Sequence, residues 1–279
     1  MICHFSCGAT SAIATALALR EDPNSEIIYA DTGAEHPDNA RFMADCERVI
    51  FHKEVTVLRH ADYSDLYEYL RKHKRIAFVH GAPCTTDLKK GVIREYLGDR
   101  LLEEEHVYGY DIGEIKRIDR YKKNNPEIML RLPLLDHGLS KANCLALLVK
   151  FGIDIPEMYK LGYGHSNCIG CVKAENLAYW AAIREDFPDI FEWMARHERR
   201  IGAIGDDGKP RGAAINKRYI SGQRHRLFLD ELPESIAPKR DVEISCGYSC
   251  GTVAGMLGAD RNLADGLESV DQIFDWLGE

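Results

Sequence analysis

Two pairs of cysteines in the second half of the chain have the spacing of metal ligands. Cys168 and Cys171 are separated by two residues, and Cys246 and Cys250 by three. Two close pairs that lie far apart in the sequence are typical of a four-thiolate site that ties the tail to the body of a protein. Such sites select zinc or an iron-sulfur cluster, and the spacing leaves both open. Unligated thiols or a transient disulfide are the alternative, which stays open for Cys246.

A second candidate site lies at the start of the chain, where a short apolar strand runs through a small polar turn into a helix. The first amides of a helix lack intrahelical partners and the helix dipole adds positive charge there, so anions bind readily. Gly8 lets the backbone approach a ligand, and serine and threonine hydroxyls add donors without bulk. The turn therefore predicts a phosphate site, with helix capping by Ser and Thr as the alternative. The residues expected to contact the phosphate are Ser6, Cys7, Gly8, Ala9, Thr10 and Ser11.

Several segments, taken in order, resemble the superfamily of phosphoadenosine phosphosulfate (PAPS) reductases and PP-loop ATP pyrophosphatases. Residues 6–11 resemble its SGGxxS-type loop, with Cys7 where a glycine is usual, and residues 31–42 resemble its DTG-x-x-x-P-E-T-x-x-F stretch. Neither the Gly-x-x-x-x-Gly-Lys-Ser/Thr pattern nor the three-glycine dinucleotide pattern is present. Further segments similar to the family are 83–89, 108–114, 133–141 and 162–174. The series covers more than half of the chain and looks like the branch common in phages and mobile elements.

The resemblance implies an enzyme that binds an adenine nucleotide, ATP or PAPS, together with Mg²⁺. The phosphates would lie on the 6–11 turn, and Asp31 would hold Mg²⁺ or orient that turn. Lys89 would offset charge on the transferred group, with Arg117 as a weaker candidate. Cys84 would be a further metal ligand, a sulfur carrier or a packing residue. Other expected nucleotide contacts are Thr32, Gly33, Gly109 and Glu114. The resemblance also favours a [4Fe-4S] cluster over Zn²⁺ at the cysteine site.

Three activities are compatible with such a nucleotide site. In a sulfurtransferase, an acceptor oxygen attacks the α-phosphate, pyrophosphate leaves, and a sulfur nucleophile then displaces AMP. In a PAPS reductase, a cysteine thiolate attacks the sulfate sulfur, and thioredoxin-like thiols release sulfite. The third is a non-catalytic nucleotide-sensing module, which Cys7 in the turn would support. Cys246 lacks the glutamate and histidine that flank the reductases' catalytic cysteine, which favours a ligand there and the sulfurtransferase overall.

The net charge of −8 argues against a protein that coats nucleic acid along its whole surface. One segment, 196–226, reverses this balance, with basic residues Arg196, Arg199, Arg200, Lys209, Arg211, Lys217, Arg218, Arg224 and Arg226. This segment indicates an anionic partner, either a polynucleotide or the nucleotide's own phosphates, with a solvated surface as the alternative. The expected partners are thus an adenine nucleotide, a nucleic acid or a sulfur-donor protein, and a second copy of the chain as a homodimer.

Strand and helix patterns alternate up to about residue 109. The expected strands are 2–5, 27–30, 54–58, 76–79, 106–110 and 128–132. The expected helices are 12–20, 39–49, 64–73, 86–96, 139–151 and 180–201, the last interrupted at 187–188. This alternation predicts an α/β fold with a mostly parallel sheet covered by helices on both faces. The candidate loops then converge beyond the carboxyl ends of the strands. We expect a nucleotide-binding domain over 1–135 and a helical, cysteine-rich region over 136–279 packed on it.

The length of 279 residues suits one large domain or a domain with an appendage. No run approaches the roughly twenty apolar residues that cross a bilayer, and no basic segment precedes an apolar one at the N-terminus. We therefore expect a cytoplasmic protein without a membrane partner. In that reducing compartment the nine cysteines are thiols or ligands rather than structural disulfides.

Overall fold

The computed structural model describes residues 1–74, 76, 82–201, 214–221, 223–242, 244 and 263–278. Its centre is a sheet of five parallel strands in the order β3-β2-β1-β4-β5. The strands are β1 (Ile2–His4), β2 (Glu26–Ala30), β3 (Thr56–Leu58), β4 (Glu105–Val107) and β5 (Met129–Arg131). The chain builds β2 and β3 on one side of β1 and then β4 and β5 on the other. The topological switch point, where open parallel sheets bind ligands, therefore lies between β1 and β4.

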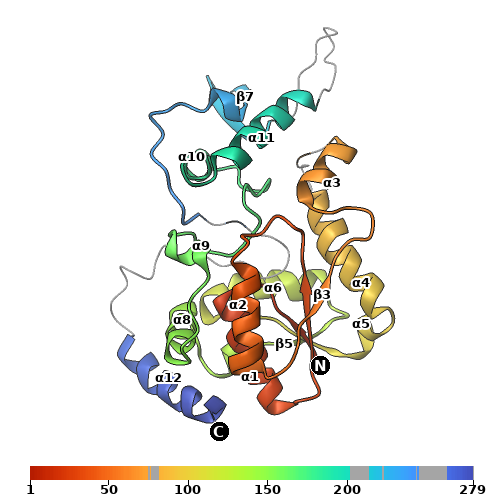
Figure 1. The fold of residues 1–279 in the computed structure, drawn as a ribbon, viewed down its shortest axis with the longest axis vertical. Coiled ribbons are helices and arrows are strands. Elements are labelled where there is room, and N and C mark those ends of the chain that lie inside the picture. The colour runs from red at the N-terminus through yellow and green to blue at the C-terminus, as the bar shows by residue number, and fades with distance from the viewer. Residues whose placement is uncertain are drawn as a thin grey trace.

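Helix α1 (Ala9–Glu21) covers one face of the sheet and is itself almost entirely buried (Figure 1). Its alanines let neighbouring backbones approach, and α8 (Lys141–Lys150) packs along it. The same core contains Cys3, Ile27 and Val107 from the facing side of the sheet. Outside α8 lies the last helix, α12 (Leu263–Gly278), which also contributes to this core.

The opposite face of the sheet is formed by the alternate residues of the same strands, because successive side chains of a strand point to opposite sides. Ile2, Ile28 and Leu58 pack there against α4 (Val92–Leu97). The π-helical turn η2 (Thr85–Gly91) leads directly into α4, and α5 (Arg100–Glu103) follows it. Helices therefore cover both faces of a parallel sheet, and the predicted α/β fold is confirmed.

Several elements differ from the predicted ones. The expected helix over 39–49 is α2 (Asn39–Cys46) followed by the π-helical turn η1 (Glu47–Phe51). The interruption expected at 187–188 is confirmed, since residues 180–201 lie in two helices, α10 (Leu177–Asp186) and α11 (Pro188–Arg200), because a proline lacks the amide that a continuous helix needs. Residues 77–79 of the expected strand over 76–79 lie outside the described residues. The remaining elements are α3 (Leu66–His73), η3 (Ile112–Glu114), α6 (Ile115–Asn124), α7 (Pro133–Asp136), α9 (Glu157–Lys160), β6 (Asn216–Ile220), β7 (Gln223–Leu227) and η4 (Leu229–Glu231).

All strands of the parallel sheet precede residue 132, and the described chain after it consists of helices and the antiparallel hairpin β6–β7. The boundary at residue 135 stays a prediction, since α8 shares one core with α1 and the sheet. Among the described helices, none is long and apolar enough to cross a membrane.

Glu198 joins the hairpin region to α11. Its side chain is fully buried, and its two carboxylate oxygens accept hydrogen bonds from the backbone amides of Ile215 and Leu229, each at 2.6 Å. Glu198→Ala leaves both amides without these acceptors, so we expect a loss of about 2–5 kcal/mol in the free energy of unfolding. Urea denaturation measures this loss. Glu192→Ala on the same helix, at a side chain that is 65% exposed, serves as the control and should change stability by less than about 0.5 kcal/mol.

The same residue gives a pH dependence of known sign. Burial raises the pKa of Glu198 to about 7 from 4.5, although both amide bonds oppose this shift. Between these values the folded state binds more protons than the unfolded state, so stability falls as pH rises. The contribution is complete below pH 4.5 and is lost as pH passes 7. The wild-type protein should therefore lose stability relative to Glu198→Gln between these two pH values, and a constant difference would contradict this assignment.

Candidate functional site

The turn between β1 and α1 is held together by the hydroxyl of Ser11. This oxygen accepts hydrogen bonds from the backbone amide and the hydroxyl of Ser6, both at 3.1 Å, and donates to the carbonyl of Gly8 at 2.9 Å. Gly8 is the N-cap of α1 and has an extended backbone. The serines expected to contact phosphate thus also set the shape of the turn. Their contact with a ligand stays a prediction.

Cys7 has a left-handed backbone, with φ of 53°, which a glycine adopts at less cost. Its thiol is fully buried and donates to the carbonyl of Asn39 at 3.7 Å. Burial raises the pKa of this thiol well above its ordinary value. Cys7 therefore packs its sulfur into the core and offers the turn only its backbone, which is the part that a glycine would also supply.

The loop after β4 lies directly against the start of α1. A Cβ atom on Gly109 would lie 2.6 Å from both the backbone nitrogen and the Cα of Ser11. The structure thus brings predicted site residues from β1 and β4 together at the switch point. Glu114 pairs instead with Arg117 at 2.5 Å, and burial raises the pKa of this carboxyl. Arg117 also lies over the ring of Tyr110, with its guanidinium carbon 5.1 Å from the ring centroid.

Asp31 and Gly33 form a tight turn after β2. One carboxylate oxygen of Asp31 accepts from the amide of Gly33 at 2.8 Å, and the other accepts from the guanidinium of Arg59 at 2.7 Å. Gly33 has a φ of +67°, and a Cβ there would lie 2.8 Å from the carbonyl oxygen of Ser64. The side chain of Arg59 is 69% exposed and that of Asp31 15% exposed, and a second guanidinium nitrogen of Arg59 donates to the same oxygen at 2.8 Å. The Mg²⁺ role of Asp31 stays a prediction.

Glu35 links this turn to the cysteine segment. Its carboxylate accepts from the hydroxyl of Thr32 at 2.7 Å and from the thiol of Cys168 at 3.6 Å, and it pairs with Lys89 at 3.2 Å. The Glu35 side chain is 5% exposed. Glu35 is not among the site residues expected from the sequence. Its signal was present, because Thr32-x-x-Glu35 has the capping-box pattern in which an acid accepts from the amide three residues before it.

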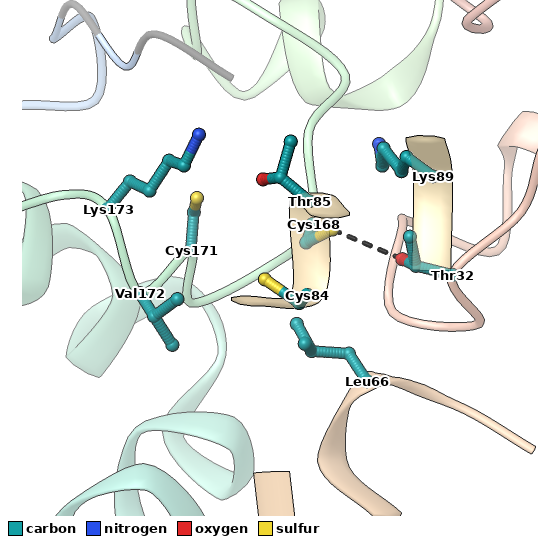
Figure 2. A pocket seen from close by; sticks show the side chains of 9 residues that line it. All are labelled: Thr32, Leu66, Cys84, Thr85, Lys89, Cys168, Cys171, Val172 and Lys173. Carbon is teal, nitrogen blue, oxygen red and sulfur yellow. Dashed lines mark hydrogen bonds between the residues drawn. The ribbon is translucent and has the colours of Figure 1, made fainter. Parts of the chain in front are cut away.

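Three cysteines line one pocket beside Glu35, as Figure 2 shows. Cys84 comes from the start of η2, whereas Cys168 and Cys171 come from the segment before α10, and Cys168 also contacts the hydroxyl of Thr32 at 3.2 Å. The ammonium groups of Lys89 and Lys173 lie on the same side of the pocket in Figure 2. The residues around the pocket are Thr32, Leu66, Cys84, Thr85, Lys89, Cys168, Cys171, Val172 and Lys173. The pocket thus collects predicted catalytic, nucleotide-binding and metal-ligating residues.

The donors of this pocket are suited to a soft metal or a cluster, because thiolates are the ligands that zinc and iron-sulfur centres prefer. Within the described residues, no three His, Cys, Asp or Glu side chains are arranged to hold a metal ion. Cys246 and Cys250, the other half of the predicted four-thiolate site, lie outside the described residues. The other described cysteines, Cys3, Cys7, Cys46 and Cys144, are buried in the core. The four-thiolate site of Cys168, Cys171, Cys246 and Cys250 therefore stays a prediction.

No family model and no curated protein sequence matches this chain. A solved structure of PAPS reductase from Candida auris, in a phosphate complex, is similar over 59% of this chain and 79% of that chain. The two share 12% sequence identity, with a TM-score of 0.45. The fold is established by the strand order of the sheet and not by this similarity. The phage branch stays a prediction.

The basic segment is only partly described, since Lys209 and Arg211 lie outside the described residues. Arg199 pairs with Asp230 at 2.7 Å and Glu231 at 2.8 Å, and Arg196 pairs with Glu192 at 3.3 Å. Carboxylates thus offset part of the positive charge counted in the sequence. A nucleic-acid partner for this segment stays a prediction.

Proposed function

We propose that this protein is an adenine-nucleotide-dependent sulfurtransferase, which adenylates an acceptor and then delivers sulfur to it. The observation that carries the proposal is the position of the three-cysteine pocket beside the turn after β2, at the carboxyl edge of the sheet. The start of α1 lies at the same edge, after the neighbouring strand β1. A phosphate site and a sulfur site on adjacent loops are what this two-step reaction requires.

The first step needs positive charge around the leaving pyrophosphate. The amides at the start of α1 would bind the terminal phosphates, and the helix dipole would favour their negative charge. Lys89 would offset charge that develops on the transferred group, and Glu35 holds this lysine at the edge of the pocket. Asp31 would exchange Arg59 for Mg²⁺. Fixed donors of this kind stabilise a transition state without reorganising during the reaction.

The second step needs a place for sulfur. Cys168 and Cys171, together with Cys246 and Cys250 of the tail, would hold a [4Fe-4S] cluster or, alternatively, Zn²⁺, and Cys84 would be a further ligand or a sulfur carrier. Such a centre binds and polarises a sulfur nucleophile. The chain's own contribution is to hold these thiols beside Thr32 and Glu35, next to the turn where adenylation would occur.

One contact favours a second candidate, a thiol-dependent PAPS reductase. The thiol of Cys168 and the ammonium of Lys89 share the same oxygen of Glu35. The ammonium of Lys89 offsets the carboxylate charge that would otherwise disfavour a Cys168 thiolate, which is the nucleophile that this reaction needs. In this case the Cys168 sulfur would attack the sulfate sulfur of PAPS, the adenosine bisphosphate would leave, and an added dithiol would release sulfite.

The test is to incubate anaerobically purified protein with ATP or with PAPS in parallel. The ATP reaction includes total cellular RNA and sulfide as a trial acceptor and sulfur source. Formation of pyrophosphate and AMP, with sulfur in the RNA, supports the sulfurtransferase. Adenosine bisphosphate and sulfite from PAPS plus dithiol would instead support the reductase. Nucleotide binding with neither product would indicate the sensing module, and absence of binding to either nucleotide would overturn the proposal.

A further inference from the structure

Tyr159, on α9, reaches the first turn of α1 from 150 residues away. The backbone amide of Ala9 donates to its hydroxyl over 3.4 Å, and a Cβ on Gly8 would lie 3.2 Å from the same hydroxyl. This hydrogen bond is longer than the 2.7–2.9 Å typical of an amide that donates to an anionic oxygen. The hydroxyl therefore occupies an anion-binding position with a weak bond that a phosphate oxygen can replace.

Lys141 is the first residue of α8 and is buried, with 3% of its surface exposed. Its ammonium donates to the carbonyl of Gly164 and lies 4.9 Å from the centroid of the Tyr159 ring. Its backbone amide donates to Asp111 at 2.9 Å, in the same loop after β4 that places Gly109 against Ser11. The fold thus buries a lysine behind the tyrosine that contacts the helix start, and long charged side chains are rarely buried without a role.

Asn39 is a third polar group beside the turn, and it provides an independent observation. Its backbone carbonyl accepts from the thiol of Cys7 at 3.7 Å. Its side chain is 5% exposed, and neither its amide nitrogen nor its amide oxygen has a hydrogen-bond partner among the described residues. A buried amide without a partner is uncommon in native proteins and indicates a missing water or ligand. Asn39 therefore indicates a polar occupant in the region where the Cys7 thiol packs.

We propose that Tyr159 and Lys141 recognise the polyanionic end of the nucleotide, an inference that rests on the proposed function. When a phosphate oxygen takes the amide of Ala9, the hydroxyl of Tyr159 changes from acceptor to donor and binds the same phosphate group. The Lys141 ammonium, held against the face of the ring, supplies the matching charge. The pair selects nucleotides that carry a diphosphate, triphosphate or phosphosulfate end, and it is indifferent to a nucleotide such as AMP that lacks one.

The test compares affinities for ligands with and without that end by isothermal titration calorimetry. The ligands are α,β-methylene-ATP, PAPS without added thiol, and AMP. Tyr159→Phe keeps the ring under Lys141 and removes only the hydroxyl, so we expect about a tenfold loss for whichever polyanionic nucleotide the wild type binds. Lys141→Met should weaken the same nucleotide about a hundredfold. Affinity for AMP should change by less than about twofold in both variants.

Tyr163→Phe is the matched control. Tyr163 follows α9 in the sequence, and the change removes another part-buried hydroxyl, which donates to Asp186 at 2.8 Å. It should leave all three affinities unchanged. If Lys141→Met does not fold, Tyr159→Phe decides alone. Wild-type affinities in the Tyr159 variant, or equal losses for AMP and the polyanionic nucleotide, would overturn the inference and leave the proposed function standing. A wild-type protein that binds neither α,β-methylene-ATP nor PAPS would overturn both.

Discussion

Gly109→Ala is expected to weaken nucleotide binding at least a hundredfold in a protein that still folds. The added Cβ would lie 2.6 Å from the backbone of Ser11 and 2.8 Å from the carbonyl carbon of Thr10. Backbone atoms cannot rotate away as a flexible side chain can, so the start of α1 must shift. A displacement of about 1 Å in a positioning element can cost a factor of about a hundred. Calorimetry with α,β-methylene-ATP and PAPS measures the loss, and urea unfolding monitors the fold.

The control for this variant is Gly278→Ala, at a position where an added Cβ meets nothing within 4 Å. It should bind nucleotide as the wild type does. If Gly109→Ala also binds with wild-type affinity, the loops after β1 and β4 do not form a common site, and the phosphate position proposed at the switch point is wrong.

Cys168→Ala is expected to lower the rate of product formation at least a hundredfold, whichever nucleotide proves to be the substrate. Its sulfur contacts both the hydroxyl of Thr32 and the carboxylate of Glu35, and the variant removes both contacts. If Cys168 is a metal ligand, the variant should also lose bound iron or zinc. Even the loss of an outer partner of a metal ligand lowers metal affinity or activity about 10–100-fold. Product analysis measures the rate, and metal analysis with the visible absorbance band measures the bound centre.

Cys144→Ala is a suitable comparison, because Cys144 is a fully buried cysteine of α8 in the core beneath α1. It should retain both activity and metal. Lost activity with intact metal in Cys168→Ala would assign the sulfur as a nucleophile and favour the reductase. Wild-type activity in Cys168→Ala would remove the three-cysteine pocket from the reaction.

The fold could be predicted because the apolar runs in the first half of the chain are short and alternate with helical patterns. The lengths of the strands were harder to predict. The expected strand over 106–110 ends at Val107, since the chain must leave the sheet for Gly109 to meet Ser11. The charged segment that follows forms α6, whose apolar residues Ile118 and Tyr121 face the core, a pattern that its many lysines and arginines obscure.

The candidate site was predictable where the residue type itself carries chemistry. Cys84, Lys89, Cys168 and Cys171 meet in one pocket, together with Thr32. Tyr159 does not reveal its role in the sequence, because its contact with Ala9, at the start of α1, spans 150 residues. Lys141 belongs to the segment 133–141 that resembles the family, but the sequence alone does not show that its side chain is buried. The proposed roles of Asp31, Lys89 and the tail cysteines stay predictions that the experiments above test.

The carboxylate of Glu35 is bonded to the turn at Thr32 and to the thiol of Cys168. Thermodynamic linkage then constrains how the two regions communicate. If oxidation of the Cys168 thiol changes the affinity of the protein for nucleotide by some factor, nucleotide binding must change the redox equilibrium of this thiol by the same factor. Measuring either quantity therefore yields the other, and a cellular redox change would reach a bound nucleotide through Glu35 and through the direct contact of Cys168 with Thr32.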